Sequence, residues 1–276
     1  MTELLKFSSK PKMRNPTLVV GWEADAARLG SSVTEYLIKN LNAQSFCEID
    51  PVEFFPLNGV AVENDVVQFP QSTFYASTEH DLIIFQSTIP RYKWQKFFNL
   101  IIDLAQQYCR VKELYTIGGM ITLAAHTVPR ESWATFNSLP IKKALSSFQL
   151  SRELDFETPP GGRPTLNSFL LWVAKSRDLP GANIWVPVPF YLITVYDAEA
   201  TRKVLTFLDS KLSLSLDFSD VENSIAQEKE RLERLRESSP EMDSYFSKLE
   251  TNLRLSEEEH ESLVKAVEDC LKNRVS

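Results

Sequence analysis

The stretch VKELYTIGGMITLAAHTVPR, from Val111 to Arg130, decides the fold of this chain. It joins a short β-prone run over 114–117 to the pair Gly118-Gly119, where a backbone can turn sharply or let another group approach closely. We therefore predict that a central strand ends at this pair. In open α/β sheets, ligands lie outside the carboxyl ends of the strands, an edge that we call the strand-end rim. The polar residues after the glycines are expected on this rim.

Three of these polar residues are His126, Thr127 and Arg130. A histidine beside an arginine could serve acid–base or anion-binding chemistry. No nucleophile with an oriented base is apparent, and neither H-x-x-x-H nor H-E-x-x-H occurs in the sequence. We therefore predict no catalytic residue here and treat the rim as a candidate cleft.

The flanking sequence predicts an α/β fold. A compact apolar run over 17–21 precedes a helical pattern of apolar residues over 26–41. A near-continuous apolar strand over 81–85, as expected when helices cover both faces of a sheet, precedes an amphipathic helix over 94–105. Residues 81–117 should thus form a β-α-β unit with a right-handed parallel crossover. Both strand-end loops would open on the same rim.

Two other segments carry turn signals. Apolar runs over 60–62 and 66–69 surround a polar Glu-Asn-Asp and predict a hairpin. The prolines around Gly161-Gly162 predict a rigid loop, after which Thr165 or Asn167 could cap a helix. For both glycine pairs, the alternatives are a structural turn and a cradle of backbone N–H groups for an anion.

The remaining cleft candidates are acidic or basic. Glu23 and Asp25 follow the first strand and could hold a metal or cap the first helix. Arg91 lies in the loop after the strand over 81–85. The full candidate cleft is Glu23, Asp25, Arg91, Gly118, Gly119, His126, Thr127, Arg130, Gly161 and Gly162.

Composition limits the classes of function. The chain has 276 residues, 43% hydrophobic and 24% charged, enough for one large α/β domain and an additional segment. Its net charge of −7 opposes binding to nucleic acid or an anionic membrane, which requires basic surface. No stretch approaches the ~20 apolar residues of a membrane span, and no signal peptide is apparent. Three separated cysteines, Cys47, Cys109 and Cys270, favour a reducing compartment, so we expect a cytoplasmic protein.

The composition changes near residue 218. Residues 220–276 lose almost all aromatic residues and become rich in Glu, Lys, Arg and Leu, with a break at Ser239-Pro240. Ser256 and Glu259 have the spacing of a capping box that opens a last helix. We predict an α/β domain over 1–217 and a helical appendage over 218–276, which packs on that domain or on a partner.

Five ordered motifs resemble a known family. They are Val19-Val20-Gly21-Trp22 with Asp25-Ala26, Gly30 and Tyr36-Leu37; Pro90-Arg91-Tyr92-Lys93-Trp94 with Phe97; Ile117-Gly118-Gly119; His126-Thr127-Val128-Pro129-Arg130; and Gly162 with Leu170, Pro180-Gly181 and Val188-Pro189-Phe190-Tyr191-Leu192. Together they span roughly residues 17–210 and resemble the PAC2 family of proteasome-assembly-chaperone-like proteins. The acidic C-terminal helices look like the tail of bacterial members.

The resemblance implies a three-layer α/β/α sandwich similar to the phosphorylase/hydrolase-like class, with a mostly parallel central sheet. It also implies homo-oligomers, trimers among them, and a role in which eukaryotic and archaeal relatives help assemble proteasome subunits. Some relatives were once labelled ATP-grasp-like. This sequence contains neither a glycine-rich nucleotide loop nor paired metal carboxylates, so we predict no cofactor and no metal.

The sequence departs from the family in two places. The usual His-Thr-Arg-Pro order is replaced by 126–130 with Arg130 displaced along the chain, and the last four residues lack the hydrophobic-Tyr-any docking tail of archaeal relatives. Our leading hypothesis is a non-enzymatic, oligomeric protein-binding or assembly factor. The alternative is an enzyme or small-molecule binder that takes a nucleoside-like or phosphorylated ligand at the rim.

Overall fold

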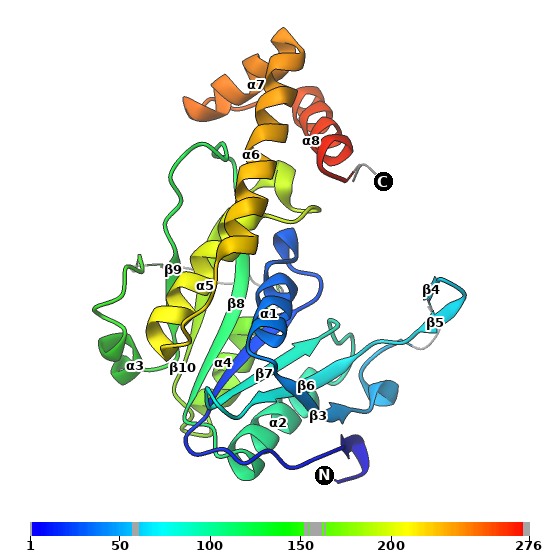
Figure 1. The fold of residues 1–276 in the computed structure, drawn as a ribbon, viewed down its shortest axis with the longest axis vertical. Helices are drawn as coiled ribbons and strands as arrows, with labels where there is room; N and C mark the ends of the chain where they lie inside the picture. The colour runs from blue at the N-terminus through cyan, green and yellow to red at the C-terminus, as the bar shows by residue number, and fades with distance from the viewer. Residues whose placement is uncertain (1, 57–60, 152–153, 155–161, 163, 273–276) are drawn as a thin grey trace.

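The described residues form a central sheet of eight strands in the order β1-β3-β6-β7-β2-β8-β10-β9 (Figure 1). A computed structural model of the chain describes residues 2–56, 61–151, 154, 162 and 164–272. The strands of the sheet are β1 (Leu5–Phe7), β2 (Thr17–Trp22), β3 (Gln44–Ile49), β6 (Ser72–Ser77), β7 (Leu82–Ser87), β8 (Glu113–Thr122), β9 (Trp133–Phe136) and β10 (Gly181–Pro189).

The sheet is parallel in its centre and antiparallel toward both edges. Strands β7, β2, β8 and β10 run parallel to one another. The pairings β1 with β3, β3 with β6, β6 with β7 and β10 with β9 are antiparallel. Helix α2 (Trp94–Asp103) joins β7 to β8 as predicted, and β2 lies between these two strands. The carboxyl ends of the four central strands therefore form the strand-end rim.

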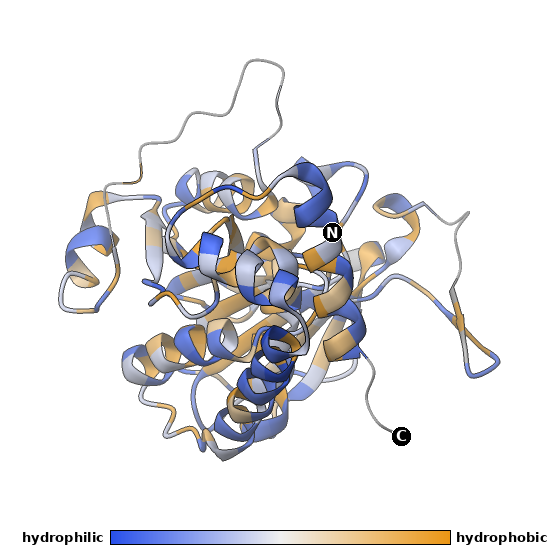
Figure 2. Ribbon diagram, turned by 90° about the horizontal axis from the view of Figure 1, so that it is seen from above, coloured by the Kyte–Doolittle hydropathy of each residue, from blue (hydrophilic) through white to orange (hydrophobic). Residues whose placement is uncertain are grey.

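Helices cover both faces of the sheet, which makes three layers (Figure 2). Helices α1 (Leu29–Asn40) and α5 (Ala198–Leu212) lie on one face, and α2 and α4 (Leu166–Lys175) lie on the other. Side chains alternate along β2, so Val19 joins the apolar cluster under α1 and α5 while Leu18 and Val20 join the cluster under α2 and α4. The predicted α/β/α fold is confirmed.

Shorter helical segments lie at the edges of these layers. They are η1 (Thr2–Leu4), η2 (Ala26–Arg28), η3 (Pro51–Glu53), η4 (Leu104–Tyr108), η5 (Phe190–Leu192) and α3 (Leu139–Ala144). The second of them, η2, forms the turn between β2 and α1. Within the described part of the chain, no helix combines the length and the apolar composition needed to cross a membrane.

The first β-α unit is confirmed and depends on two glycines. A Cβ atom on Gly21 would lie 2.2 Å from the carbonyl oxygen of Gly30, in the first turn of α1. A Cβ atom on Gly30 would lie 2.7 Å from the backbone nitrogen of Trp22. Only residues without a Cβ let the backbones of β2 and α1 approach so closely. This contact positions the loop that follows β2.

Strands β4 (Ala61–Glu63) and β5 (Val66–Gln68) form the predicted hairpin, which projects from the body of the molecule (Figure 1). Asn64 and Asp65 between them have φ angles of 50° and 63°, the left-handed values that a two-residue type I′ turn requires. The register places Val62 opposite Val67. We call the hairpin, together with Phe69, the arm. Residue 60 of the predicted hairpin lies outside the described residues.

The appendage comprises α6 (Ser219–Ser238), α7 (Pro240–Glu250) and α8 (Glu257–Lys272), and it rises beyond the sheet (Figure 1). The predicted capping box opens α8: the N–H of Ser256 donates to Glu259 Oε2 at 2.9 Å, and the N–H of Glu259 donates to Ser256 Oγ at 3.2 Å. Leu232, Phe246 and Leu263 belong to the same buried cluster as α1 and α5. The appendage therefore packs on the α/β domain, and the boundary at residue 217 stays a prediction.

Candidate functional site

The pair Gly118-Gly119 lies inside β8, which continues to Thr122, so the prediction of a strand end at this pair was wrong. A Cβ atom on Gly118 would lie 2.8 Å from the ring of Trp185 on β10. A Cβ atom on Gly119 would lie 2.8 Å from both the Cβ and the carbonyl oxygen of Ala26. The glycines are thus explained by close approach of neighbouring groups, the other property considered for them.

A buried polar network lies beneath the rim, on the face covered by α4. Trp22 Nε1 donates to Asn167 Oδ1 at 2.6 Å, and Asn167 Nδ2 donates to the carbonyl oxygen of Ile117 at 2.8 Å. Thr116 Oγ1 donates to Asn183 Oδ1 at 2.9 Å, while Asn183 Nδ2 has no partner among the described residues. Sequence reasoning missed this network. The available signal was an asparagine within an apolar strand and another within an apolar helix, which require partners when buried.

Glu23 and Asp25 follow β2 and make two different contacts. Glu23 Oε2 accepts a hydrogen bond from Thr88 Oγ1 at 2.6 Å, which links the loops after β2 and β7. Both carboxylate oxygens of Asp25 lie 3.1 Å from the N–H of Gly30, which agrees with a capping role at α1. Burial raises the pKa of Asp25 to about 7. Among the described residues, no group of three His, Cys, Asp or Glu side chains is placed to hold a metal ion.

His126 and Thr127 contact the appendage and a buried tyrosine. His126 Nδ1 lies 2.8 Å from the hydroxyl of Tyr191, which also accepts the backbone N–H of His126 at 2.6 Å. The imidazole packs edge-on against Phe246 of α7, with ring centroids 5.3 Å apart, and Thr127 Oγ1 donates to Glu250 at 2.8 Å. Burial lowers the pKa of His126 to about 4, so the imidazole is neutral near pH 7. Both residues therefore attach α7 to the rim.

Arg130 is buried, with a side chain only 3% exposed, where α5 and α6 meet the rim. Its guanidinium forms an ion pair with Asp197, lies 3.4 Å from Glu199 Oε2 and donates to the carbonyl oxygen of Pro187 at 3.2 Å. Glu228 of α6 accepts the first N–H of α5 at 3.0 Å. Burial, together with the charge of Asp197, raises the pKa of Glu228 to about 8. One arginine thus faces three carboxyl groups, and we call these four residues the buried charge cluster.

The Glu228→Gln variant is expected to flatten the dependence of stability on pH. The pKa of Glu228 is about 8 in the folded protein and has its ordinary value of 4.5 in the unfolded chain. Between these two pH values the folded protein binds a proton that the unfolded chain has released, so the free energy of unfolding falls as the pH rises from 4.5 to about 8. The fall is up to about 1.4 kcal/mol per pH unit, and glutamine keeps the acceptor oxygen but removes the charge. Urea unfolding across this window measures the slope.

The control is Glu230→Gln, an exposed position of the same helix, which should retain the wild-type slope. If Glu228→Gln also unfolds with the wild-type pH dependence, the assignment of a buried proton to Glu228 is incorrect.

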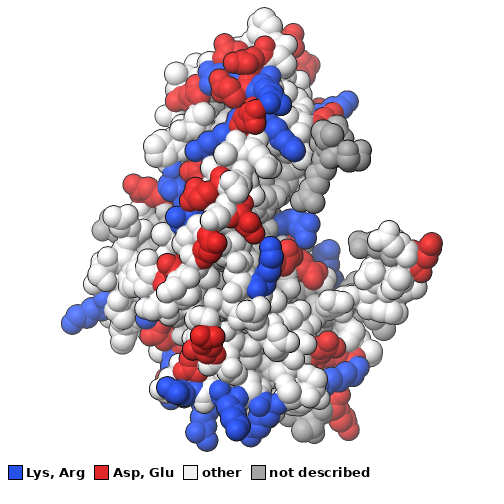
Figure 3. All heavy atoms as spheres, viewed as in Figure 1, with Lys and Arg blue, Asp and Glu red and all other residues white. Residues whose placement is uncertain are grey.

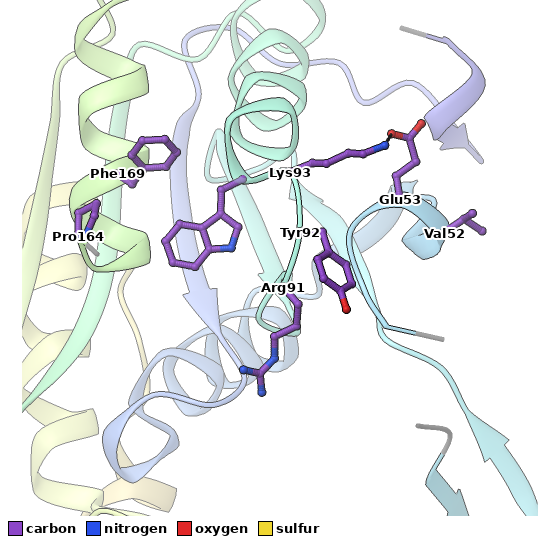
Figure 4. A pocket seen from close by; sticks show the side chains of 8 residues that line it. Val52, Glu53, Arg91, Tyr92, Lys93, Pro164 and Phe169 are labelled. Atoms are coloured by element: carbon purple, nitrogen blue, oxygen red, sulfur yellow. Dashed lines mark hydrogen bonds and ion pairs between the residues drawn. The ribbon is translucent and has the colours of Figure 1, made fainter. Parts of the chain in front are cut away.

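Arg91 lies apart from the other candidates, in the loop between β7 and α2. It lines a hollow of about 840 Å³ between η3, this loop, α2 and α4 (Figure 4). Lys93 Nζ donates to Glu53 at 2.8 Å, whereas the Arg91 guanidinium has no acidic partner among the described residues. We call this surface the hollow, and its lining residues are Val52, Glu53, Arg91, Tyr92, Lys93, Trp94, Pro164 and Phe169.

The candidate cleft is therefore divided between two faces of the sheet. Asp25 and Gly119 lie together beside η2, and His126, Thr127 and Arg130 lie beneath α5, α6 and α7, on the face covered by α1. Arg91 lies with α2 and α4 on the opposite face. Gly162 is exposed, and Gly161 lies outside the described residues. Binding of a ligand by these residues stays a prediction.

Comparisons with known proteins agree with this geometry. The chain is similar in structure to a Corynebacterium glutamicum protein of unknown function, with 19% identity, a TM-score of 0.76 and coverage of 90% of this chain and 96% of that one. A Mycobacterium tuberculosis proteasome-assembly chaperone homologue, Rv2125, matches with 16% identity, a TM-score of 0.69 and coverage of 83% and 99%. Pyrococcus furiosus PbaB, an archaeal proteasome activator, matches with 21% identity, a TM-score of 0.68 and coverage of 84% and 98%. No curated protein matches the chain.

The fold and the rim define a three-layer α/β/α protein whose sheet carries a C-terminal helical appendage over its strand ends. The PAC2 family matches residues 18–236, which include the sheet apart from β1 and the first residue of β2, its covering helices and most of α6. The chain belongs to the PAC2 family, as its motifs indicated.

Proposed function

We propose that this chain is a chaperone-like protein-binding and assembly factor that forms homo-oligomers in the cytoplasm, trimers being favoured by the family resemblance. One observation carries the proposal: apart from Arg91, the charged and histidine side chains expected on the rim already have partners in their own chain. Glu23 contacts Thr88, and His126 and Arg130 are held by Tyr191 and Asp197. An enzyme needs such groups free to contact a substrate.

Family membership supports the same conclusion. Two proteins of the same fold are described as a proteasome-assembly chaperone homologue and an archaeal proteasome activator.

The surface outside the rim has the composition of a protein interface. Tyr92 and Trp172 are 54% and 55% exposed, and Trp172 stacks on Phe169 with ring centroids 5.3 Å apart. Trp94 packs against Phe169, and both line the hollow with Arg91, which has no acidic partner in the described part of the chain. Aromatic residues and arginine are enriched where proteins meet, and exposed aromatic clusters usually mark such contacts.

The test combines native mass with capture from the source organism's lysate. We expect the full chain to form a discrete oligomer by light scattering and to retain a stoichiometric protein. The Trp172→Ser variant should retain less of that protein, and Leu139→Ser, which alters an exposed leucine on α3, should retain as much as wild type. A strictly monomeric chain that captures no protein would contradict the proposal.

Small molecules of the nucleoside and phosphate classes are expected to leave thermal stability unchanged. A ligand at ~100 times its Kd would add about 2.7 kcal/mol to the free energy of unfolding. A thermal-shift series with inorganic phosphate, nucleosides and nucleotides measures this directly. A saturable increase in Tm that Arg91→Gln abolishes would support the alternative, a small-molecule binder.

A further inference from the structure

The arm exposes an apolar face that no other described element covers. Val62 and Val67 lie opposite each other across the hairpin and therefore share one face, and Phe69, the residue directly after β5, is exposed beside them in the chain. These three side chains are 64%, 47% and 59% exposed, respectively. Strands β4 and β5 pair with each other and, within the described residues, with no third strand. A two-stranded hairpin of this kind is marginally stable in water unless something packs on it.

The hollow offers a surface that complements this face. Its apolar wall is formed by Val52, Tyr92, Trp94 and Phe169, of which Val52 and Tyr92 are more than half exposed. The arm of the same chain leaves its own hollow open, since its apolar side chains remain in solvent. An arm from another molecule therefore has both an apolar face to bury and a matching surface to receive it.

Charge adds a second element of complementarity. Asp65 lies exposed at the turn of the arm, and Figure 3 shows acidic side chains at the arm tip. The hollow carries Arg91 and Lys93; Lys93 pairs with Glu53, which also binds Lys96 outside the hollow, and Arg91 lacks an acidic partner among the described residues. An acidic group at the tip of the arm and a cationic Arg91 beside the apolar wall of the hollow would favour one partner and one orientation of the contact.

We propose that the arm of one copy lies in the hollow of a second copy, with Val62, Val67 and Phe69 against the aromatic wall and Asp65 near Arg91. The two surfaces differ, so the contact is head-to-tail, and repetition around a symmetry axis closes it into a ring. The inference rests on the proposed self-association and names the surfaces that produce it.

The test uses one substitution on each surface of the full chain. Val67→Asp alters the arm and Tyr92→Asp alters the hollow, both at exposed positions where the fold of the domain does not depend on the side chain. Each variant alone should be monomeric by light scattering and sedimentation, with self-association weakened at least about tenfold. Leu139→Asp, a control at a still more exposed apolar position on α3, should keep the native mass.

Mixing the two variants tests the head-to-tail geometry. The arm variant retains an intact hollow and the hollow variant retains an intact arm, so a mixture should form 1:1 dimers that cannot grow further. A mixture that stays monomeric would overturn the proposal. Variants with lower Tm and unchanged mass would mean that the arm packs on its own chain, which also overturns it.

A double-mutant cycle tests the charged contact. Asp65→Asn keeps a residue that tolerates the left-handed turn, and Arg91→Gln removes the opposite charge. Each single variant should weaken self-association by about two- to fivefold, and the double variant should be no weaker than either single one. If the losses of affinity in the two single variants add up in the double variant, Asp65 and Arg91 do not contact each other.

The wild-type mass separates the two proposals. A monomeric wild type would contradict both. An oligomeric wild type whose mass is unaffected by Val67→Asp and Tyr92→Asp would overturn the arm contact and leave the assembly-factor proposal standing.

Discussion

Replacement of Arg130 by methionine is expected to lower the free energy of unfolding by about 3–5 kcal/mol. The guanidinium is 3% exposed and is the cationic member of the buried charge cluster. Its removal leaves the fully buried Asp197 without its ion-pair partner and Glu199 without a nearby cation. Since buried carboxylates cannot recover hydration, the loss should exceed that of a surface ion pair. Urea unfolding followed by circular dichroism measures it.

The matched control is Arg234→Met. Arg234 pairs with Glu230 on the exposed face of α6, where both side chains are more than 60% exposed. Exposed pairs of this kind contribute under about 1 kcal/mol, so the control should unfold close to wild type. Equal effects of the two substitutions would show that the buried charge cluster does not depend on Arg130.

The Arg130 variant should also loosen the appendage. Glu228 joins α6 to the first turn of α5, and its carboxyl group faces the same cluster. Hydrogen exchange in α6 and α7 is therefore expected to rise more than exchange in the central strands, because local opening follows the element whose contacts are lost. An equal increase in hydrogen exchange in the appendage and in the central strands would indicate that the buried charge cluster stabilises the whole fold instead.

Gly21→Ala is expected to destabilise the chain by about 3 kcal/mol or to reduce the yield of folded protein. The added methyl group would lie 2.2 Å from the carbonyl oxygen and 2.7 Å from the carbonyl carbon of Gly30. Both of these atoms belong to the backbone of α1, which packs on β2. A flexible side chain could move aside, but here β2 and α1 must separate. Loss of near-ultraviolet dichroism and a lower urea midpoint would report this separation.

Gly181→Ala provides a graded comparison. Its nearest neighbour is the end of the flexible Leu171 side chain at 2.9 Å, and the nearest backbone atom, the carbonyl oxygen of Leu114, is 3.1 Å away. A smaller loss of stability is expected because the side chain can adjust. If Gly181→Ala proved the more damaging of the two, close approach between β2 and α1 would not be the reason for glycine at position 21.

Local signals in the sequence were sufficient for several elements. The apolar periods over 17–41 and 81–105 correspond to β2, α1, β7 and α2, and the Glu-Asn-Asp turn lies in a hairpin. Ser256 and Glu259 form their capping box, whose two hydrogen bonds span only three residues. Each of these features depends on neighbours in the chain, so the residue pattern contains the necessary information.

The Gly118-Gly119 pair illustrates where local reasoning fails. A glycine pair after a β-prone run is compatible with a turn and with a strand that admits bulky neighbours. The choice depends on Trp185 and Ala26, which are 67 and more than 90 positions away, respectively. Likewise, the loops after β7 and β8 follow parallel strands and open on one rim as expected, yet Arg91 lines the hollow beside α2 and α4 while His126 and Arg130 lie beneath α5, α6 and α7.

The sequence by itself determined the PAC2 family, the three-layer α/β/α fold and the presence of a helical appendage, because these follow from ordered motifs and local periodicity. Only the tertiary structure decided what the polar residues of the rim do. His126, Thr127 and Arg130 bind groups on η5, α7 and the start of α5, segments 60 to more than 120 residues away in the chain. Burial then keeps His126 neutral by lowering its pKa, since desolvation depends on packing and not on neighbouring residues in the sequence.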